Sequence, residues 1–254
     1  MSNVMIKTEA QIKKIRIAGK ILASIAAEIR KAVRVGITLK ELDTLAQKLI
    51  RDAGAEPTFL GYRPYGAAKA FPASICASLN EVVVHGVPNG YKLKSGDLLK
   101  LDFGVTYQGH IADGAFTVGL GTISEEAKRL MEATKNALTI GIKECNPGKT
   151  LGDIGWAINH YVTKHGFKVV KGLTGHGVGI ELHEDPPVFN EGQKNTGLEL
   201  KAGMVLALEP MVSAGDPYIL QLPDDSYATR DKSLSAHFEH TVLITKKGPE
   251  ILTK

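Results

Sequence analysis

The sequence predicts a single α+β domain, residues 1–254, made of two copies of a helix–helix–strands unit. Segments 36–54 (GITLKELDTLAQKLIRDAG) and 148–166 (GKTLGDIGWAINHYVTKHG) align without gaps and share Gly, Thr and Leu at the start and Gly at the end. A stretch with helical spacing precedes each segment, and strand-like runs follow each. This repeated order favours an internal duplication, covering roughly 10–120 and 124–245.

Four helices are expected, two of them over roughly 10–35 and 124–144 and the others within the repeated segments. Each repeated segment begins with a capping box, in which a threonine and an acidic residue three positions later satisfy free backbone N–H groups. The pairs are Thr38 with Glu41 and Thr150 with Asp153. Glycine at the end of each segment is a common helix stop signal.

Three stretches are typical of strands. Residues 98–120 (LLKLDFGVTYQGHIADGAFTVGL) predict a hairpin, 205–212 (VLALEPMV) a buried strand stopped by proline, and 234–245 (LSAHFEHTVLIT) another strand. No long linker separates the two halves.

Composition excludes several classes of protein. The net charge of +4 is mild and the basic residues are spread along the chain, which argues against sequence-specific nucleic-acid binding. The basic start, KTEAQIKKIRIAGK, predicts a solvated helix face, for which we expect at most a transient contact with the ribosome. The sequence has two cysteines, no signal peptide and no membrane-length apolar run, so we expect a cytoplasmic protein without membrane partners.

Two aspartates of the hairpin are expected on the same face of its ladder. A turn at Gln108–Gly109 puts Asp102 and Asp113 on the same face, about 7–8 Å apart diagonally across the ladder. Two exposed, solvated acids are the alternative, but the flanking residues are those of core strands, where an unpaired carboxylate is costly. We expect no lysine or arginine on that face, and the pair therefore predicts a metal ion.

Two further carboxylates and three histidines extend this hypothesis. Glu209 ends an apolar run, where it could also emerge into solvent, and Glu239 is expected in the middle of a strand. His176 lies in GHGVG, where glycines allow close approach of the backbone, and is the expected nitrogen ligand. His183 and His85 are expected to contact substrate, although a lone histidine is more often structural.

Oxygen-rich ligation with one imidazole and no thiolate suits manganese, iron or cobalt and is compatible with zinc. Four carboxylates carry enough charge for two divalent ions. A two-metal centre with a bridging water is suited to hydrolysis.

These motifs resemble those of type I methionine aminopeptidases, which have the two-fold pseudo-symmetric "pita-bread" fold, with a curved antiparallel sheet covered by helices. The resemblance covers nearly the whole chain and rests on five stretches in the family's order: NEVVVHGVP (80–88), LDFGVTYQGHIADGAFTVG (101–119), GHGVGIELHEDP (175–186), GMVLALEPMV (203–212) and SLSAHFEHT (233–241). It implies removal of N-terminal methionine from nascent chains and peptides when the second residue is small. A monomer is expected.

The resemblance also implies the roles of individual residues. The ligands of two divalent ions would be Asp102, Asp113, His176, Glu209 and Glu239. Glu209 would also carry a proton from the attacking water to the departing amine. His85 and His183 would contact the scissile amide and stabilise its negative charge.

The resemblance further implies a methionine pocket and a monovalent-cation site. The pocket would be lined by Tyr62, Tyr65, Cys76 and Leu182, and the cation would lie near Asn80 and Ser235. The chain departs from the family pattern in a longer stretch at 63–76 and in lacking a tryptophan before SLSA, where Tyr227 is the nearest aromatic residue.

Two rival functions remain. A prolidase or aminopeptidase P shares the metal pattern, but has an extra N-terminal domain and a VHD-like context where this chain has LHEDP. A non-enzymatic binding module on the same fold would have lost metal ligands, and all five are present. A type II methionine aminopeptidase is disfavoured, because only 29 residues separate Glu209 from Glu239.

Overall fold

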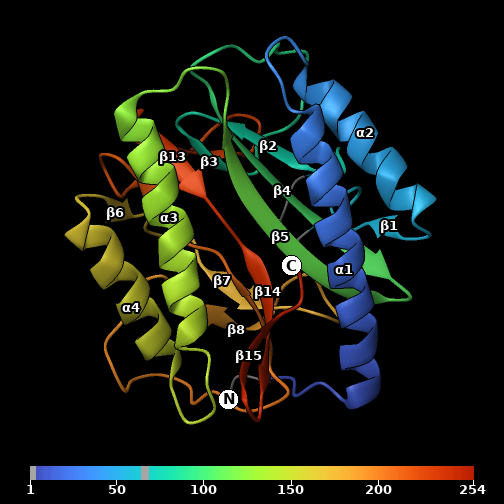
Figure 1. The fold of residues 1–254 in the computed structure, drawn as a ribbon, viewed down its shortest axis with the longest axis vertical. Helices are drawn as coiled ribbons and strands as arrows, with labels where there is room; N and C mark the ends of the chain where they lie inside the picture. Colours follow the sequence, from blue (N-terminus) through green and yellow to red (C-terminus); the bar gives the residue numbers. More distant parts are fainter. Residues whose placement is uncertain (1–3, 64–68) are drawn as a thin grey trace.

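The computed structural model describes residues 4–63 and 69–254, in which two pairs of helices flank antiparallel strands (Figure 1). One pair is α1 (Glu9–Ala32) and α2 (Leu39–Asp52), and the other is α3 (Glu125–Lys143) and α4 (Leu151–Lys164). In Figure 1 the blue pair lies on the right and the green-to-yellow pair on the left, with the strands between them. The four expected helices are thus confirmed, with ends that shift by only a few residues.

Both predicted capping boxes are present. Thr38 Oγ1 accepts the N–H of Glu41 at 3.1 Å, and the Glu41 carboxylate accepts the N–H of Thr38 at 2.8 Å. Thr150 and Asp153 make the same reciprocal pair at 3.3 and 2.8 Å. These bonds satisfy N–H groups that the first turn of a helix leaves free.

The residues just before α2 and α4 are fixed by equivalent backbone hydrogen bonds in the two halves. The N–H of Gly36 donates to Leu93 O at 2.8 Å, and the N–H of Gly148 donates to Leu200 O at 3.1 Å. The repeated contacts agree with the alignment of 36–54 with 148–166. The shared origin of the halves, and the boundaries 10–120 and 124–245 within one catalytic domain, stay predictions.

Every strand pair in the described residues is antiparallel, and the strands fall into four hydrogen-bonded sheets. The first sheet contains β1 (Glu56–Pro57), β2 (Cys76–Leu79), β4 (Leu98–Tyr107) and β5 (His110–Gly119). The second contains β6 (Lys168–Val169), β10 (Met211–Ser213) and β13 (Ser235–His237), and the third contains β3 (Val82–Val84), β11 (Ile219–Gln221) and β12 (Tyr227–Thr229). The fourth contains β7 (Gly175–Gly177), β8 (Glu184–Val188), β9 (Val205–Leu208), β14 (His240–Thr245) and β15 (Gly248–Ile251).

One hydrophobic cluster joins the two halves. It extends from Ile15 of α1 through Phe103 of β4 to Ile158 of α4 and Leu206 of β9, all of them buried. Helix α1 packs across β4 and β5, and α3 packs against α4 and β13. In the described part of the chain, no helix is long and apolar enough to cross a bilayer.

The predicted register of the hairpin is confirmed. Tyr107 pairs with His110 across the turn, so Asp102 faces Ala115 and Asp113 faces Gly104. Because side chains alternate along a strand, the two aspartates share one face, as the sequence predicted.

One expectation about this face is wrong. Lys100 lies two residues before Asp102 on β4 and therefore shares its face, although we expected no cation there. The lysine is fully buried, and its Nζ donates to the backbone oxygen of Asn80 at 2.6 Å. Its bond is thus to a neutral carbonyl outside the carboxylate pair.

Two predicted strands are interrupted, and each break holds a candidate ligand. Strand β9 ends at Leu208 and β10 begins at Met211, so Glu209 lies in the gap with Pro210. Proline has no N–H to give to a ladder, which explains the break. Glu239 was expected in the middle of a strand, and this was wrong: β13 ends at His237 and β14 begins at His240. A residue between two strands is released from the pleat and can aim its side chain independently.

The glycines around His176 allow close packing of β7 between β8 and β9, as predicted. A Cβ at Gly175 would lie 2.3 Å from Ala207 O, and one at Gly177 would lie 2.4 Å from Asp185 O. No side chain fits between these backbones.

We therefore predict that Gly175→Ala lowers the free energy of unfolding by about 2 kcal/mol, the usual scale of overpacking. Denaturant unfolding would measure it. Gly90→Ala is the matched control, because nothing lies within 4 Å of a Cβ there; it should stay within about 0.5 kcal/mol of the parent. Equal stability of both variants would contradict the close approach.

Candidate metal centre

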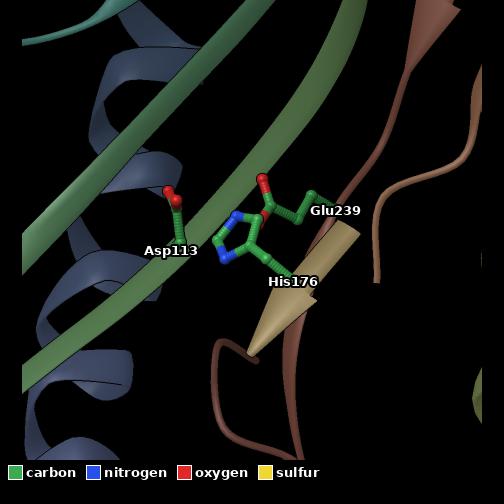
Figure 2. Close-up of side chains that lie close together, drawn as sticks. All are labelled: Asp113, His176 and Glu239. Atoms are coloured by element: carbon green, nitrogen blue, oxygen red, sulfur yellow. The ribbon is translucent and has the colours of Figure 1, made fainter. Parts of the chain in front are cut away.

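Asp113, His176 and Glu239 project from different segments into the same space (Figure 2). They come from β5, from β7 and from the gap between β13 and β14. Their ligand atoms all lie within 4.8 Å of one another, and each residue is buried. Glu239 also belongs to a second group of the same kind, with Glu209 and His237. The two groups meet at Glu239.

Hydrogen bonds to the backbone hold these segments together. Thr241 Oγ1 accepts the N–H of Asp113 at 2.9 Å and donates to its carbonyl oxygen at 2.8 Å. The N–H of Glu239 donates to Ala115 O at 2.9 Å. The hairpin of the first half is thereby fixed against β14 of the second half. This contact places Asp113 and Glu239 side by side.

Several polar atoms at this place are buried without a hydrogen-bond partner in the described part of the chain. They are Asp102 Oδ1, Glu239 Oε1 and both ring nitrogens of His237. A buried polar group without a partner normally costs about 1–3 kcal/mol. Lone pairs of oxygen and nitrogen that converge and lack donors are suited to a cation. These oxygen and nitrogen atoms are therefore suitable ligands for a divalent metal ion.

The pKa values of the four carboxyls reflect the same crowding. Burial and the charge of Asp113 raise the pKa of Asp102, and burial raises that of Asp113 to about 7. Burial and neighbouring carboxylates likewise raise the pKa values of Glu209 and Glu239. Four ionised acids cannot share this space without positive charge, so binding of divalent cations displaces protons.

His176 is held in the form that a metal requires. Its Nδ1 lies 2.9 Å from the carbonyl oxygen of Gly177, which can only accept, so Nδ1 carries the hydrogen. Nε2 then has a free lone pair, and it lies 3.4 Å from Glu209 Oε1. Burial lowers the pKa of His176 to about 4, so the ring is neutral at physiological pH. A carbonyl that fixes the tautomer in this way is common for metal-binding histidines.

His85 and His183, the histidines expected to contact substrate, are exposed. Four of the candidate ligands are buried and Asp102 is half-buried. The ring centroid of His183 lies 4.5 Å from that of His176, and Nδ1 of His183 is 2.7 Å from the Tyr62 hydroxyl. Desolvation and the neighbouring imidazoles lower the pKa of His183 to about 3. His85 packs against Tyr227, with ring centroids 5.7 Å apart. Desolvation lowers its pKa as well.

The expected methionine pocket is only partly described. Cys76 and Leu182 are buried, and Cys76 pairs with Asp102 across the β2–β4 ladder. Burial raises the pKa of Cys76 well above its usual value, so the thiol stays neutral. Tyr62 reaches the site through His183, and Tyr65 lies outside the described residues.

One residue of the site escaped the sequence reasoning. His237 is buried with its Nε2 3.3 Å from Glu209 Oε2, and it lies two residues before Glu239. Its backbone exchanges two hydrogen bonds with Thr117 of β5, at 2.7 and 2.9 Å. The available signal was a histidine in an apolar strand next to a candidate ligand. Burial lowers its pKa to about 3, so the ring is neutral.

The raised carboxyl pKa values predict that the metal-free protein loses stability as the pH rises from about 6.5 to about 8. The folded chain retains protons that the unfolded chain releases near pH 4, so the free energy of unfolding falls through the folded pKa, about 7 for Asp113. Below about pH 6.5 the buried histidines oppose this, and above about pH 7 Lys100 opposes it in part, because their lowered pKa values make folding displace protons.

The measurement is thermal unfolding of chelator-treated protein across this pH range. Saturating Mn²⁺ should reverse the trend, because the ion binds the deprotonated carboxylates. A metal-free unfolding temperature that does not change with pH would mean that the four carboxyls are already ionised.

Comparison with known proteins agrees with this geometry. Residues 13–246 match the model of "Metallopeptidase family M24". The chain is 43% identical to methionine aminopeptidase 1 of Bacillus subtilis over 252 residues, covering 99% of each chain. A crystal structure of methionine aminopeptidase from Rickettsia prowazekii superposes with a TM-score of 0.94, at 40% identity, covering 99% of this chain and 100% of that one.

The likeness to prolidase is one of fold. The prolidase of Pyrococcus furiosus has a TM-score of 0.78 at 23% identity, and the match covers 98% of this chain and 65% of that one. Family, fold and a buried cluster of metal-binding residue types therefore agree, and the chain belongs to the methionine aminopeptidases of metallopeptidase family M24.

Proposed function

We propose that this protein removes N-terminal methionine from nascent proteins and peptides whose second residue is small. The observation that carries the proposal is the pair of ligand groups that share Glu239 in the interior of a chain from this family. The mechanism is hydrolysis of the first peptide bond.

The ions would be held by Asp102, Asp113, His176, Glu209 and Glu239. When bound, two divalent ions of cobalt, manganese, iron or zinc would supply Lewis acidity to polarise the scissile carbonyl and to lower the pKa of water. Glu239 belongs to both ligand groups, and it and the neighbouring Asp113 would be the carboxylates that serve both ions.

Glu209 acts as the proton carrier. It lies in the gap after β9, where Asn190 Nδ2 donates to its backbone oxygen at 3.0 Å and fixes the main chain. Its carboxylate accepts the proton of the attacking water and gives it to the departing amine. His237 lies 3.3 Å from the same carboxylate and limits its movement.

His183 and His85 stabilise the charge that develops on the scissile amide. When the Tyr62 hydroxyl donates to Nδ1 of His183, the hydrogen of the ring is on Nε2 and can be donated to substrate. The lowered pKa keeps the ring neutral, so it donates without adding a cation beside the metals. Both rings are open to solvent, where a peptide can reach them.

Recognition of methionine falls to Tyr62, Tyr65, Cys76 and Leu182. A flexible thioether suits an apolar slot with a neutral thiol. Tyr227 lies against His85 and is the aromatic residue nearest to where the family carries tryptophan.

Partners and location follow from this chemistry. All five proposed ligands come from one chain, so we infer a monomer. The exposed Lys13 and Lys20 of α1 suit a transient ribosome contact, and action on nascent chains suits a cytoplasmic enzyme.

Asp113→Ala should abolish turnover and leave the chain folded, because it removes a carboxylate that serves both ions. His183→Ala should lower kcat by roughly 10²–10³-fold, the usual effect of losing one oxyanion donor. Metal content measured in both variants separates the two roles. Metal loss in His183→Ala would make His183 a ligand, and turnover by Asp113→Ala would refute the site.

The activity itself is tested by methionine release from Met-Ala-Ser, with metal-stripped protein and added Mn²⁺, Co²⁺ or Fe²⁺. Xaa-Pro peptides are the control substrate. We expect metal-dependent release of methionine and no cleavage of Xaa-Pro peptides. Cleavage of Xaa-Pro peptides alone would identify a prolidase. Metal binding without either activity would favour the binding module.

A further inference from the structure

Three donor groups from two other segments lie within hydrogen-bond distance of the carbonyl oxygen of Asn80. Lys100 Nζ lies 2.6 Å away, the N–H of Ser235 3.1 Å and Ser235 Oγ 3.0 Å. Ser235 Oγ is also 3.3 Å from Val82 O. Two carbonyls from the β2–β3 turn and β3, a hydroxyl from β13 and an amine from β4 thus converge.

This arrangement does not fit the monovalent cation expected near Asn80 and Ser235. Such an ion needs several oxygens with free lone pairs, and a carbonyl oxygen has only two. Lys100 Nζ and the N–H of Ser235 alone occupy both lone pairs of Asn80 O. The side chain of Lys100 is fully buried and fills the adjoining space.

Lys100 has the character of a bound ion. In the part of the chain that the structure describes, no carboxylate forms an ion pair with it, and its one hydrogen bond is to a neutral oxygen. Burial lowers the pKa of Lys100 to about 7, and the negative charge of Glu81, next to Asn80 in the chain, acts in the opposite direction. Carbonyl oxygens with a nearby acid are also the ligands that an alkali ion would use.

We propose that Lys100 Nζ takes the place of a monovalent cation in this protein, so that neither its stability nor its site geometry depends on K⁺ or Na⁺. The amine links β4, which carries Asp102, to the β2–β3 turn. Ser235 links the same turn to β13, which leads to Glu239. His85 follows β3, so this junction connects the proposed ligands to a proposed substrate contact.

The first test is thermal unfolding of the metal-stripped protein in KCl, NaCl and choline chloride at equal ionic strength. Because the unfolding temperature does not depend on peptidase activity, this test can fail or succeed independently of the proposed function. We expect the same unfolding temperature in all three salts. Selective stabilisation by K⁺ or Na⁺ would show that an alkali ion still binds, and would overturn the proposal.

The second test removes the amine. Lys100→Met keeps an unbranched stem and should unfold roughly 5 °C lower in choline chloride, with recovery in KCl or NaCl as the ion enters the vacated space. Lys13→Met, at an exposed lysine of α1, is the matched control and should respond to the three salts as the parent does. An equal loss for Lys100→Met in all salts would mean that the lysine is only structural.

Anomalous diffraction from crystals grown with rubidium chloride would locate a bound alkali ion directly. The parent protein can be tested in this way even if the variant does not fold. We expect no anomalous peak beside Asn80 O in the parent, and a peak in Lys100→Met or in the roomier Lys100→Ala. A peak in the parent would contradict the proposal.

Discussion

Desolvation of four carboxylates is the constraint on which the rest of this structure depends. Asp102, Asp113, Glu209 and Glu239 converge here, and burial raises all four pKa values. Repulsion by neighbouring carboxylates raises those of Asp102, Glu209 and Glu239 further. Such a cluster is stable only with protons or with cations. The surrounding imidazoles are neutral and offer lone pairs, with His176 turned so that Nε2 is free. The electrostatics of this site therefore favour binding of divalent cations even without substrate.

The main chain makes this convergence possible through departures from regular sheet. Glu209 and Glu239 lie where strands are interrupted, and Gly175 and Gly177 allow three strands to approach so closely that no Cβ would fit. Helices α1 to α4 and the shared hydrophobic cluster support these irregular segments from outside. The regular helices and strands make the structure rigid, and the interruptions between strands determine where Glu209 and Glu239 point.

Buried lysines support the site from its edge. Lys7 forms a buried ion pair with Glu184, whose carboxylate also accepts the N–H groups of Ile180 and Glu181 at 2.6 and 3.0 Å. This network fixes the segment that carries His183. Lys100 likewise fixes the segment that leads to His85, through its hydrogen bond to Asn80 O.

The sequence by itself determined the local features of this protein. Period-two alternation and a two-residue turn were enough to place Asp102 and Asp113 on one face, and threonine–acid pairs marked the helix starts. Tertiary structure alone decided the contacts between distant segments: the interruption beside Glu239, the approach of His237 to Glu209 and the bond from Lys100 to Asn80. The physical reason is that alternation and capping act over a few neighbouring residues. Pairing between strands from opposite halves depends on packing of the whole chain.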